Sequence, residues 1–71
     1  MKNNKIEIYI NGNKKIVNKN LNLKKILKEF LIKNQLFAVE LNNEVIPKSQ
    51  YKNKKVMQND KIEILELIGG G

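Results

Sequence analysis

A single amphipathic helix is the feature that most constrains this chain, because it gives the clearest periodic signal in the sequence. Apolar residues recur at positions i, i+3, i+4, i+7 and i+8, which lie on one face of an α-helix. Those residues are Leu23, Ile26, Leu27, Phe30 and Leu31. Asn22 is suited to cap the first turn, and Asn34 to close the last turn in the left-handed conformation. The sequence therefore predicts one helix over residues 23–33, with an apolar stripe that the rest of the chain has to cover.

The segment before this helix predicts a β-hairpin. Isoleucine occupies every second position of residues 6–10, which is the period of a strand with one buried face. The strand leads into Asn11-Gly12, the pair that most readily adopts the two positive φ angles of a type I′ turn. Residues 14–17 are expected to return as a second strand with a weaker pattern.

Two further strands are predicted after the helix. Alternation over residues 39–41 indicates one strand, and the pair Asn42-Asn43 is typical of a turn. A short strand at residues 45–46 stops at Pro47, because proline has no N–H to donate to a sheet.

The last part of the chain predicts one more strand. Residues 48–55 are polar and indicate a loop or one helical turn, with the ring of Tyr51 filling the edge of the core. Asn59-Asp60 then turns the chain into residues 61–68, the longest and most apolar strand, which we expect to be central in the sheet.

One helix and four to five strands predict an α+β fold in which a mixed sheet packs on the single helix. The expected contribution of the sheet to the core is Ile6, Ile8, Ile10, Val39, Leu41, Ile62 and Ile64. A chain of 71 residues has room for only one such core. We expect residues 1–68 to form the folded domain and residues 69–71 a flexible tail.

The composition excludes most catalytic chemistry. The chain has no Cys and no His, and Ser49 is its only serine. The acidic residues show no spacing typical of a metal site or of an acid/base pair. We therefore expect no catalytic residue, no metal site and no cofactor bound by this chain. No apolar run approaches the ~20 residues of a membrane span and no secretory signal is present, so we expect an intracellular protein.

The positive charge is concentrated in the first half of the chain. The net charge is +7, and residues 1–33 carry all of that excess. A small basic module that binds nucleic acid is one alternative interpretation. However, the chain has no Arg, its four aromatic residues are scattered, and its frequent Lys, Asn and Ile are typical of A/T-rich codons. We expect no nucleic-acid partner.

The three glycines at residues 69–71 are the least expected feature of the sequence. A tail without side chains cannot pack against a core, and it can enter a narrow channel without steric cost. Its α-carboxylate, with a pKa of ~3.3 to 3.7, is ionised at neutral pH and could attack the α-phosphorus of ATP. Because the chain offers no Mg²⁺ site, Arg or phosphate-binding loop, a separate enzyme would have to carry out that activation.

Taken together, these elements resemble the ThiS-type sulfur carriers of the ubiquitin-like β-grasp fold. The resemblance covers nearly the whole chain, and its most specific parts are residues 42–51 and the terminal Gly70-Gly71. It implies that a ThiF-type enzyme, using ATP and Mg²⁺, adenylates Gly71, and that a sulfur-donor enzyme completes its conversion to a thiocarboxylate. The thiocarboxylate would then donate sulfur to the thiazole ring of thiamine on a ThiG-type synthase. The protein would accordingly be a co-substrate rather than an enzyme.

The sequence departs from the family pattern at two positions and leaves alternatives open. Asn59 stands where the family usually has Gly before Asp60, and Gly69 where a small residue such as Ala is common. The MoaD-type carriers of molybdopterin synthesis share the fold and the diglycine, but they tend to have a proline before the tail that this chain lacks. Conjugation to other proteins through the tail is a third alternative. The compartment would be the cytoplasm or, alternatively, a plastid stroma.

Two leucines next to the tail are the predicted partner-binding residues. Leu65 and Leu67 point away from the face that Ile62 and Ile64 bury, because strand side chains alternate. An exposed apolar pair beside a reactive end is typical of a recognition surface. The competing interpretation is that another segment covers this second face of the strand.

Overall fold

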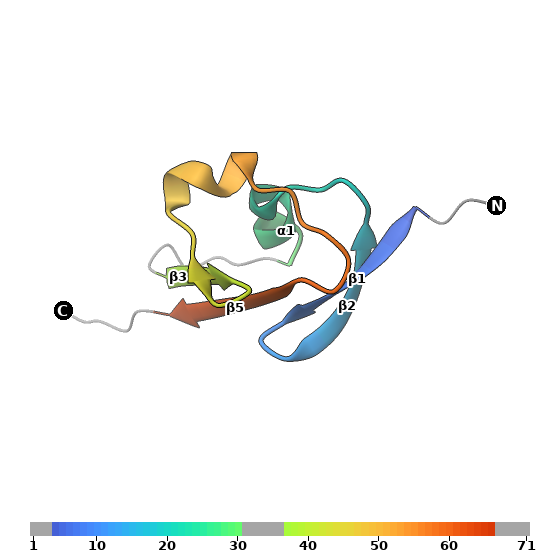
Figure 1. The fold of residues 1–71 in the computed structure, drawn as a ribbon, viewed down its shortest axis with the longest axis horizontal. Helices are drawn as coiled ribbons and strands as arrows, with labels where there is room; N and C mark the ends of the chain where they lie inside the picture. The colour runs from blue at the N-terminus through green and yellow to red at the C-terminus, as the bar shows by residue number, and fades with distance from the viewer. Residues whose placement is uncertain (1–3, 31–36, 67–71) are drawn as a thin grey trace.

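The computed structural model describes residues 4–30 and 37–66, which form a five-stranded mixed sheet with one α-helix packed on it (Figure 1). The strands are β1 (Lys5–Ile10), β2 (Asn13–Asn18), β3 (Phe37–Leu41), β4 (Glu44–Val45) and β5 (Lys61–Glu66). The helices are α1 (Leu23–Glu29) and the 3₁₀-helix η1 (Lys48–Asn53). The strand order is β2-β1-β5-β3-β4, so the predicted α+β architecture is confirmed.

The first hairpin forms as its turn sequence predicts. Asn11 and Gly12 have φ angles of 51° and 84°, the positive values that a type I′ turn requires. β1 and β2 pair antiparallel, with Ile6 opposite Val17 on the face that is buried. The neighbouring Ile16 lies on the other face and is exposed.

The second hairpin uses two asparagines in place of Asn-Gly. Asn42 and Asn43 have φ angles of 52° and 72°, and Asn is the non-glycine residue best suited to this conformation. The short strand begins one residue earlier than predicted, at Glu44. Ile46 follows the strand instead of belonging to it, although its N–H still donates to the carbonyl oxygen of Val39 at 2.9 Å.

The helix begins where its cap predicts. The backbone N–H of Lys25 donates to the side-chain oxygen of Asn22 at 2.8 Å, which satisfies one of the free donors of the first turn. α1 ends at Glu29, with Phe30 at the C-cap. The predicted extension to residue 33 and the cap at Asn34 lie outside the described residues.

The polar segment after β4 does more than connect two strands. Residues 48–53 form the predicted helical turn, and the side chain of Tyr51 within this turn is buried. The chain then runs alongside the start of α1, where the N–H of Leu23 donates to the carbonyl oxygen of Lys54 and the N–H of Val56 to that of Leu21. The sequence pattern did not indicate this pairing, because it joins two irregular segments.

The core lies between α1, η1 and one face of the sheet. Its buried apolar residues are Ile6, Ile8, Ile10, Val17, Leu23, Ile26, Leu27, Val39, Leu41, Ile46, Tyr51, Val56 and Ile62. Phe30 and Ile64 pack against this cluster and are partly buried. Every predicted core residue within the described ranges therefore reaches the core, and Leu31 lies outside them. Val17, Ile46 and Val56 also enter the core, although they are not among the core residues predicted from the sequence.

β5 is the central strand, as its apolar character predicts. It runs parallel to β1 and antiparallel to β3, with Ile62 opposite both Ile10 and Leu41. The described strand ends at Glu66, so the last two residues of the predicted range 61–68 are outside it. Within the described residues, no helix has the length and apolarity that crossing a membrane requires.

Because the core is thin, one large cavity should destabilise it severely. Replacing Leu27, which is 6% exposed, by Ala removes buried side-chain volume from α1, and we expect it to lower the free energy of unfolding by about 2 to 5 kcal/mol. Leu65→Ala is the matched control, because Leu65 is 46% exposed and its truncation leaves no cavity. Urea denaturation followed by circular dichroism measures both. Equal losses in the two variants would contradict the proposed core.

Candidate functional site

The candidate site is the end of strand β5, because the glycine run follows it in the sequence. Of the residues predicted for the site, only Leu65 lies within the described part of the chain. Leu67, Gly69, Gly70 and Gly71 lie outside it. The structure therefore shows how β5 is held as far as Glu66, three residues before the glycine run in the sequence.

Side chains from both hairpin turns hold β5 in place. The amide oxygen of Asn11 accepts the N–H of Ile64 at 2.7 Å, and its amide nitrogen donates to the carbonyl oxygen of the same residue at 3.5 Å. The amide oxygen of Asn42 accepts the N–H of Lys61 at 2.9 Å. The two asparagines thus extend the hydrogen bonding of the sheet along β5 from either side.

Asp60 completes the support at the start of β5. One of its carboxylate oxygens accepts the N–H of Met57 at 2.8 Å, and the other accepts the side-chain N–H of Asn42 at 3.0 Å. Asn59, with φ 71°, adopts the left-handed conformation and donates its N–H to the carbonyl oxygen of Glu7 at 2.7 Å. The predicted Asn-Asp turn is confirmed, and Asp60 gains a structural role that the sequence did not suggest.

The sheet face opposite α1 carries a mixed apolar and acidic surface near the end of β5. We call it the outer patch and define it as Ala38, Glu40, Val45, Glu63 and Leu65. These residues share one face because Ala38 lies opposite Leu65, and Glu40 opposite both Glu63 and Val45. Leu65 is 46% exposed and Val45 62% exposed. Leu65 is thus a surface residue, as predicted, and no described segment covers it.

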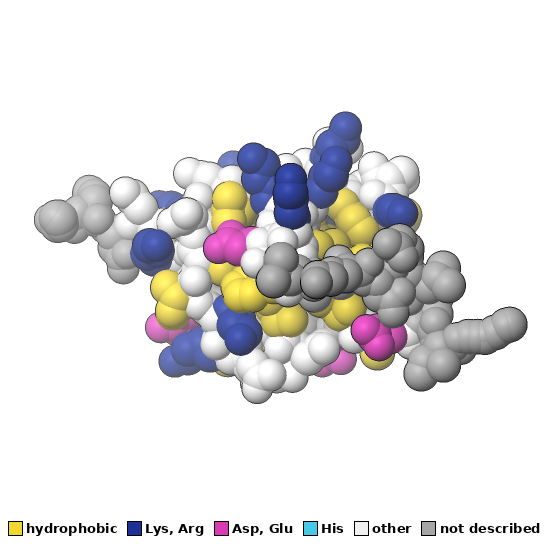
Figure 2. Space-filling model, turned by 180° about the vertical axis from the view of Figure 1, so that it is seen from behind, with side chains coloured by type: hydrophobic (Ala, Val, Ile, Leu, Met, Phe, Trp, Pro, Cys, Tyr) yellow, Lys and Arg dark blue, Asp and Glu magenta, His cyan; other side chains and the backbone are white. Residues whose placement is uncertain are grey.

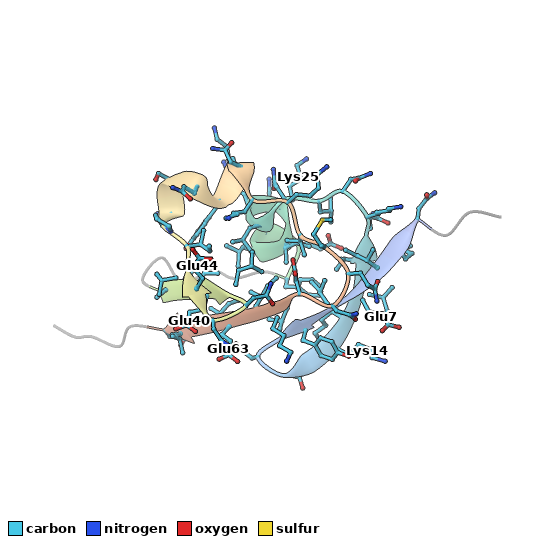
Figure 3. The ribbon with its side chains drawn as sticks, in the orientation of Figure 1. Glu7, Lys14, Lys25, Glu40, Glu44 and Glu63 are labelled. Atoms are coloured by element: carbon cyan, nitrogen blue, oxygen red, sulfur yellow. The ribbon has the colours of Figure 1, made fainter. Side chains whose placement is uncertain are left out.

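Two carboxylates face each other across the middle of the outer patch. Glu40 on β3 and Glu63 on β5 are directly opposite, and Figure 3 shows both side chains on the side of the sheet away from Lys25 of α1. Like charges in this arrangement destabilise a sheet. Neither carboxylate has a salt bridge within the described residues. A cation brought by another molecule would relieve this repulsion.

The acidic side chains near β5 lie apart from one another in the described part of the chain, except for the facing pair Glu40 and Glu63. Over residues 4–30 and 37–66, no three His, Cys, Asp or Glu side chains gather as a metal site would require. The acidic groups near β5 serve other purposes, since Asp60 holds a turn and the carboxylates of Glu40 and Glu63 lie on an open face. What the arrangement can do is present a rigid strand end and an adjacent contact surface.

Comparison with known proteins identifies what this arrangement resembles. The ThiS family model matches residues 3–71. Over 66 residues the chain is 35% identical to a thiazole synthase of Paramagnetospirillum magneticum. The matched segment makes up 93% of this chain but only 20% of that protein. Over 46 residues it is 35% identical to the sulfur carrier protein ThiS of Bacillus subtilis, covering 65% of this chain and 70% of the relative.

Two further similarities extend over most of the chain. An uncharacterized protein ycf40 of Trieres chinensis is 33% identical over 63 residues, covering 89% of this chain and 86% of the relative. The crystal structure of the thiamine biosynthesis protein ThiS from Geobacter metallireducens superposes with a TM-score of 0.83 at 28% identity. That match covers 93% of this chain and 100% of the solved one, so the β-grasp fold expected from the sequence is confirmed.

The support of β5 by turn side chains can be tested with a matched pair of variants. Asn42→Ala removes two hydrogen bonds of the side chain in addition to a residue suited to positive φ. Asn43→Ala changes only the conformational preference, because the Asn43 side chain forms no hydrogen bond within the described ranges 4–30 and 37–66. We expect Asn42→Ala to cost about 1 to 3 kcal/mol more in unfolding free energy, measured by urea denaturation. Equal costs would show that the side-chain bonds do not stabilise β5.

Proposed function

The chain belongs to the ThiS family, the sulfur carrier proteins of thiamine biosynthesis, and from this membership we propose how it carries sulfur. Its C-terminal Gly71 is adenylated and then converted to a thiocarboxylate, which supplies the sulfur of the thiazole ring. The observation that carries the proposal is the family match over residues 3–71, which includes the glycine run at its end.

The proposed chemistry uses only the α-carboxylate of this chain. The carboxylate of Gly71 is ionised at neutral pH and attacks the α-phosphorus of ATP, which releases pyrophosphate and leaves an acyl-adenylate. Hydrosulfide (HS⁻), supplied by a sulfur-donor enzyme, then attacks the carbonyl carbon; the new C–S bond replaces the C–O bond to AMP, which leaves, and one proton is released. The resulting thiocarboxylate keeps the sulfur on the carrier until the thiazole-forming enzyme takes it.

In this proposal the carrier binds neither ATP nor Mg²⁺, and the activating enzyme supplies both. Bringing a carboxylate to a triphosphate requires cations that neutralise the two anions. The chain has no Arg and no phosphate-binding loop, and its acidic side chains near β5 are spread over the outer patch and a turn. A ThiF-type adenylyltransferase is therefore the proposed partner for activation.

The proposed sulfur acceptor is a ThiG-type thiazole synthase. The similarity to about a fifth of a thiazole synthase of Paramagnetospirillum magneticum supports this pairing, because a segment like this carrier is part of that protein. The proposed division of labour within the chain is a folded domain over residues 1–68 and a flexible glycine tail over residues 69–71. The tail would enter the active site of each enzyme, in the cytoplasm or in a plastid stroma.

The outer patch is the proposed contact surface for the activating enzyme. It adjoins the end of β5, so an enzyme that binds it holds the tail within reach of its active site. Leu65 supplies exposed apolar surface, and the facing carboxylates of Glu40 and Glu63 favour a partner that brings a cation. Leu67, two residues after Leu65 in the sequence, is proposed to extend this surface.

The tail chemistry predicts a defined change in mass. After incubation with ATP, Mg²⁺, a ThiF-type enzyme and a sulfur source, intact-protein mass spectrometry should show one oxygen replaced by sulfur, and fragmentation should place it at Gly71. Deleting Gly70-Gly71 should abolish the product, whereas Gly12→Ala, which alters a turn remote in sequence, should retain it. Formation of the product in the deleted chain would refute the proposed chemistry.

The outer patch predicts a separation of folding from binding. Leu65→Glu should leave the unfolding midpoint nearly unchanged, because the side chain is 46% exposed, and should weaken binding to the activating enzyme by about tenfold. Ile16→Glu is the matched control, since Ile16 is 54% exposed on the same face of the sheet but on the edge strand β2. Isothermal titration calorimetry measures both affinities. Similar weakening by the two variants, or unfolding of Leu65→Glu, would contradict the assignment.

A further inference from the structure

A second surface lies on the other side of the sheet, in a groove between α1 and η1. The groove has a volume of about 530 Å³, which is within the range of sites that bind ligands or peptide side chains. We call it the lysine groove; the described residues that line it are Lys24, Leu27, Lys28, Phe37, Lys48, Ser49, Tyr51 and Lys52.

The floor of the lysine groove is apolar. Leu27 and Tyr51 reach it from α1 and η1, and each is less than 10% exposed. Phe37, at the start of β3, is half-buried and leaves part of its ring at the surface. Burial raises the pKa of the Tyr51 hydroxyl, so this group remains neutral over the physiological range. The floor therefore offers hydrophobic and aromatic surface without charge.

All the charged side chains among the described residues that line the groove are lysines. Lys24 and Lys28 stand four residues apart on α1, and Lys48 and Lys52 stand four residues apart on η1. All four are exposed, none forms a salt bridge within the described residues, and none of the described lining residues is acidic. Figure 2 shows lysine side chains gathered along the upper edge of the molecule with hydrophobic surface beneath them.

The groove lies at the end of the sheet where the described part of β5 stops. Phe37 on its floor is directly opposite Glu66, the last described residue of β5. The outer patch lies near the same strand end but on the opposite face, where Ala38 faces Leu65. A molecule in the groove would thus sit beside the described end of β5, without covering the outer patch.

We propose that the lysine groove binds an acidic segment of one of the two enzymes that handle the tail, with an apolar side chain of that segment resting on the groove floor. Carboxylates of the segment would neutralise the ammonium groups of the lysine pair on α1 and of the lysine pair on η1. The apolar side chain would cover the exposed part of Phe37. Only the identity of the enzymes rests on the proposed function.

The lining favours a peptide over a phosphate-bearing small molecule. Arg, whose planar fork suits phosphate, is absent from the chain, and lysine ammonium groups act as mobile point charges. The apolar floor would gain nothing from inorganic phosphate, whereas a peptide side chain would bury it. Lysines on both α1 and η1, with an apolar floor between the two helices, match an acidic segment that has an apolar residue at its centre.

The test measures binding of the full chain to the purified ThiF-type enzyme and, separately, to the purified ThiG-type synthase. The groove variant is Lys28→Glu/Lys52→Glu, and the matched control is Lys19→Glu/Lys55→Glu. The control makes the same change in charge at two exposed lysines that do not line the groove. Calorimetric titration at two salt concentrations should show the groove variant binding one enzyme about tenfold more weakly than the control. Thermal unfolding of both variants verifies that they fold.

Other outcomes would overturn the proposal. Equal weakening by the groove and control variants would mean that only the overall positive charge matters. Unchanged affinity for both enzymes would mean that nothing in them occupies the groove. Ser49→Glu places a carboxylate on the rim without removing a lysine, and it should also weaken binding to the same enzyme.

A small anion is distinguished by a separate titration. Adding ATP or pyrophosphate at millimolar concentration to the ¹⁵N-labelled chain should leave the amide signals of residues 48–52 unmoved. Saturable shifts of these signals would show that the groove binds a small anion and would overturn the proposed peptide. Mass spectrometry of the unaltered chain after sulfur loading keeps the two proposals apart. If the chain binds an enzyme through the groove but is never loaded, the proposed function fails and the groove assignment stands.

Discussion

The pairing of β5 with β1 on one side and β3 on the other holds the sheet together. Ile62 on this strand is buried between Ile10 and Leu41, so the strand joins the two hairpins into one sheet above α1. Removing it would leave two separate hairpins, which are marginally stable alone. Asn11 and Asn42 add side-chain hydrogen bonds from either side. A strand anchored this firmly is suited to present a tail that has no structure-forming side chains of its own.

The two faces at the described end of β5 differ in charge, and the proposed function gives this difference a use. The outer patch combines Leu65 with the facing carboxylates of Glu40 and Glu63, while the lysine groove on the helix side is rimmed by ammonium groups. In the proposed function, successive enzymes recognise and release the carrier. Two contact surfaces of opposite charge would then allow different partners to hold it without requiring the same complementary surface.

The candidate site could be predicted from the sequence only in part. Alternation along the last strand was sufficient to place Leu65 on the open face, because strand side chains alternate regardless of context. The roles of Asn11 and Asn42 were missed, since they were recognised as turn residues while their side-chain bonds reach β5 about twenty to fifty positions away. The lysine groove was also missed, because its lysines come from two segments, α1 and η1, that only their packing against each other brings together.

The amino-acid sequence was sufficient to predict the local elements: the helix and its Asn22 cap, the turns at positive φ, and the alternation that separates buried from exposed strand faces. These follow from backbone sterics and side-chain periodicity, which act between near neighbours. Three features became evident only in the folded chain: Glu40 faces Glu63, Val56 enters the core, and the lysines of α1 and η1 share a groove. Such contacts depend on which distant segments pack together, and that is set by burying the whole apolar surface at once.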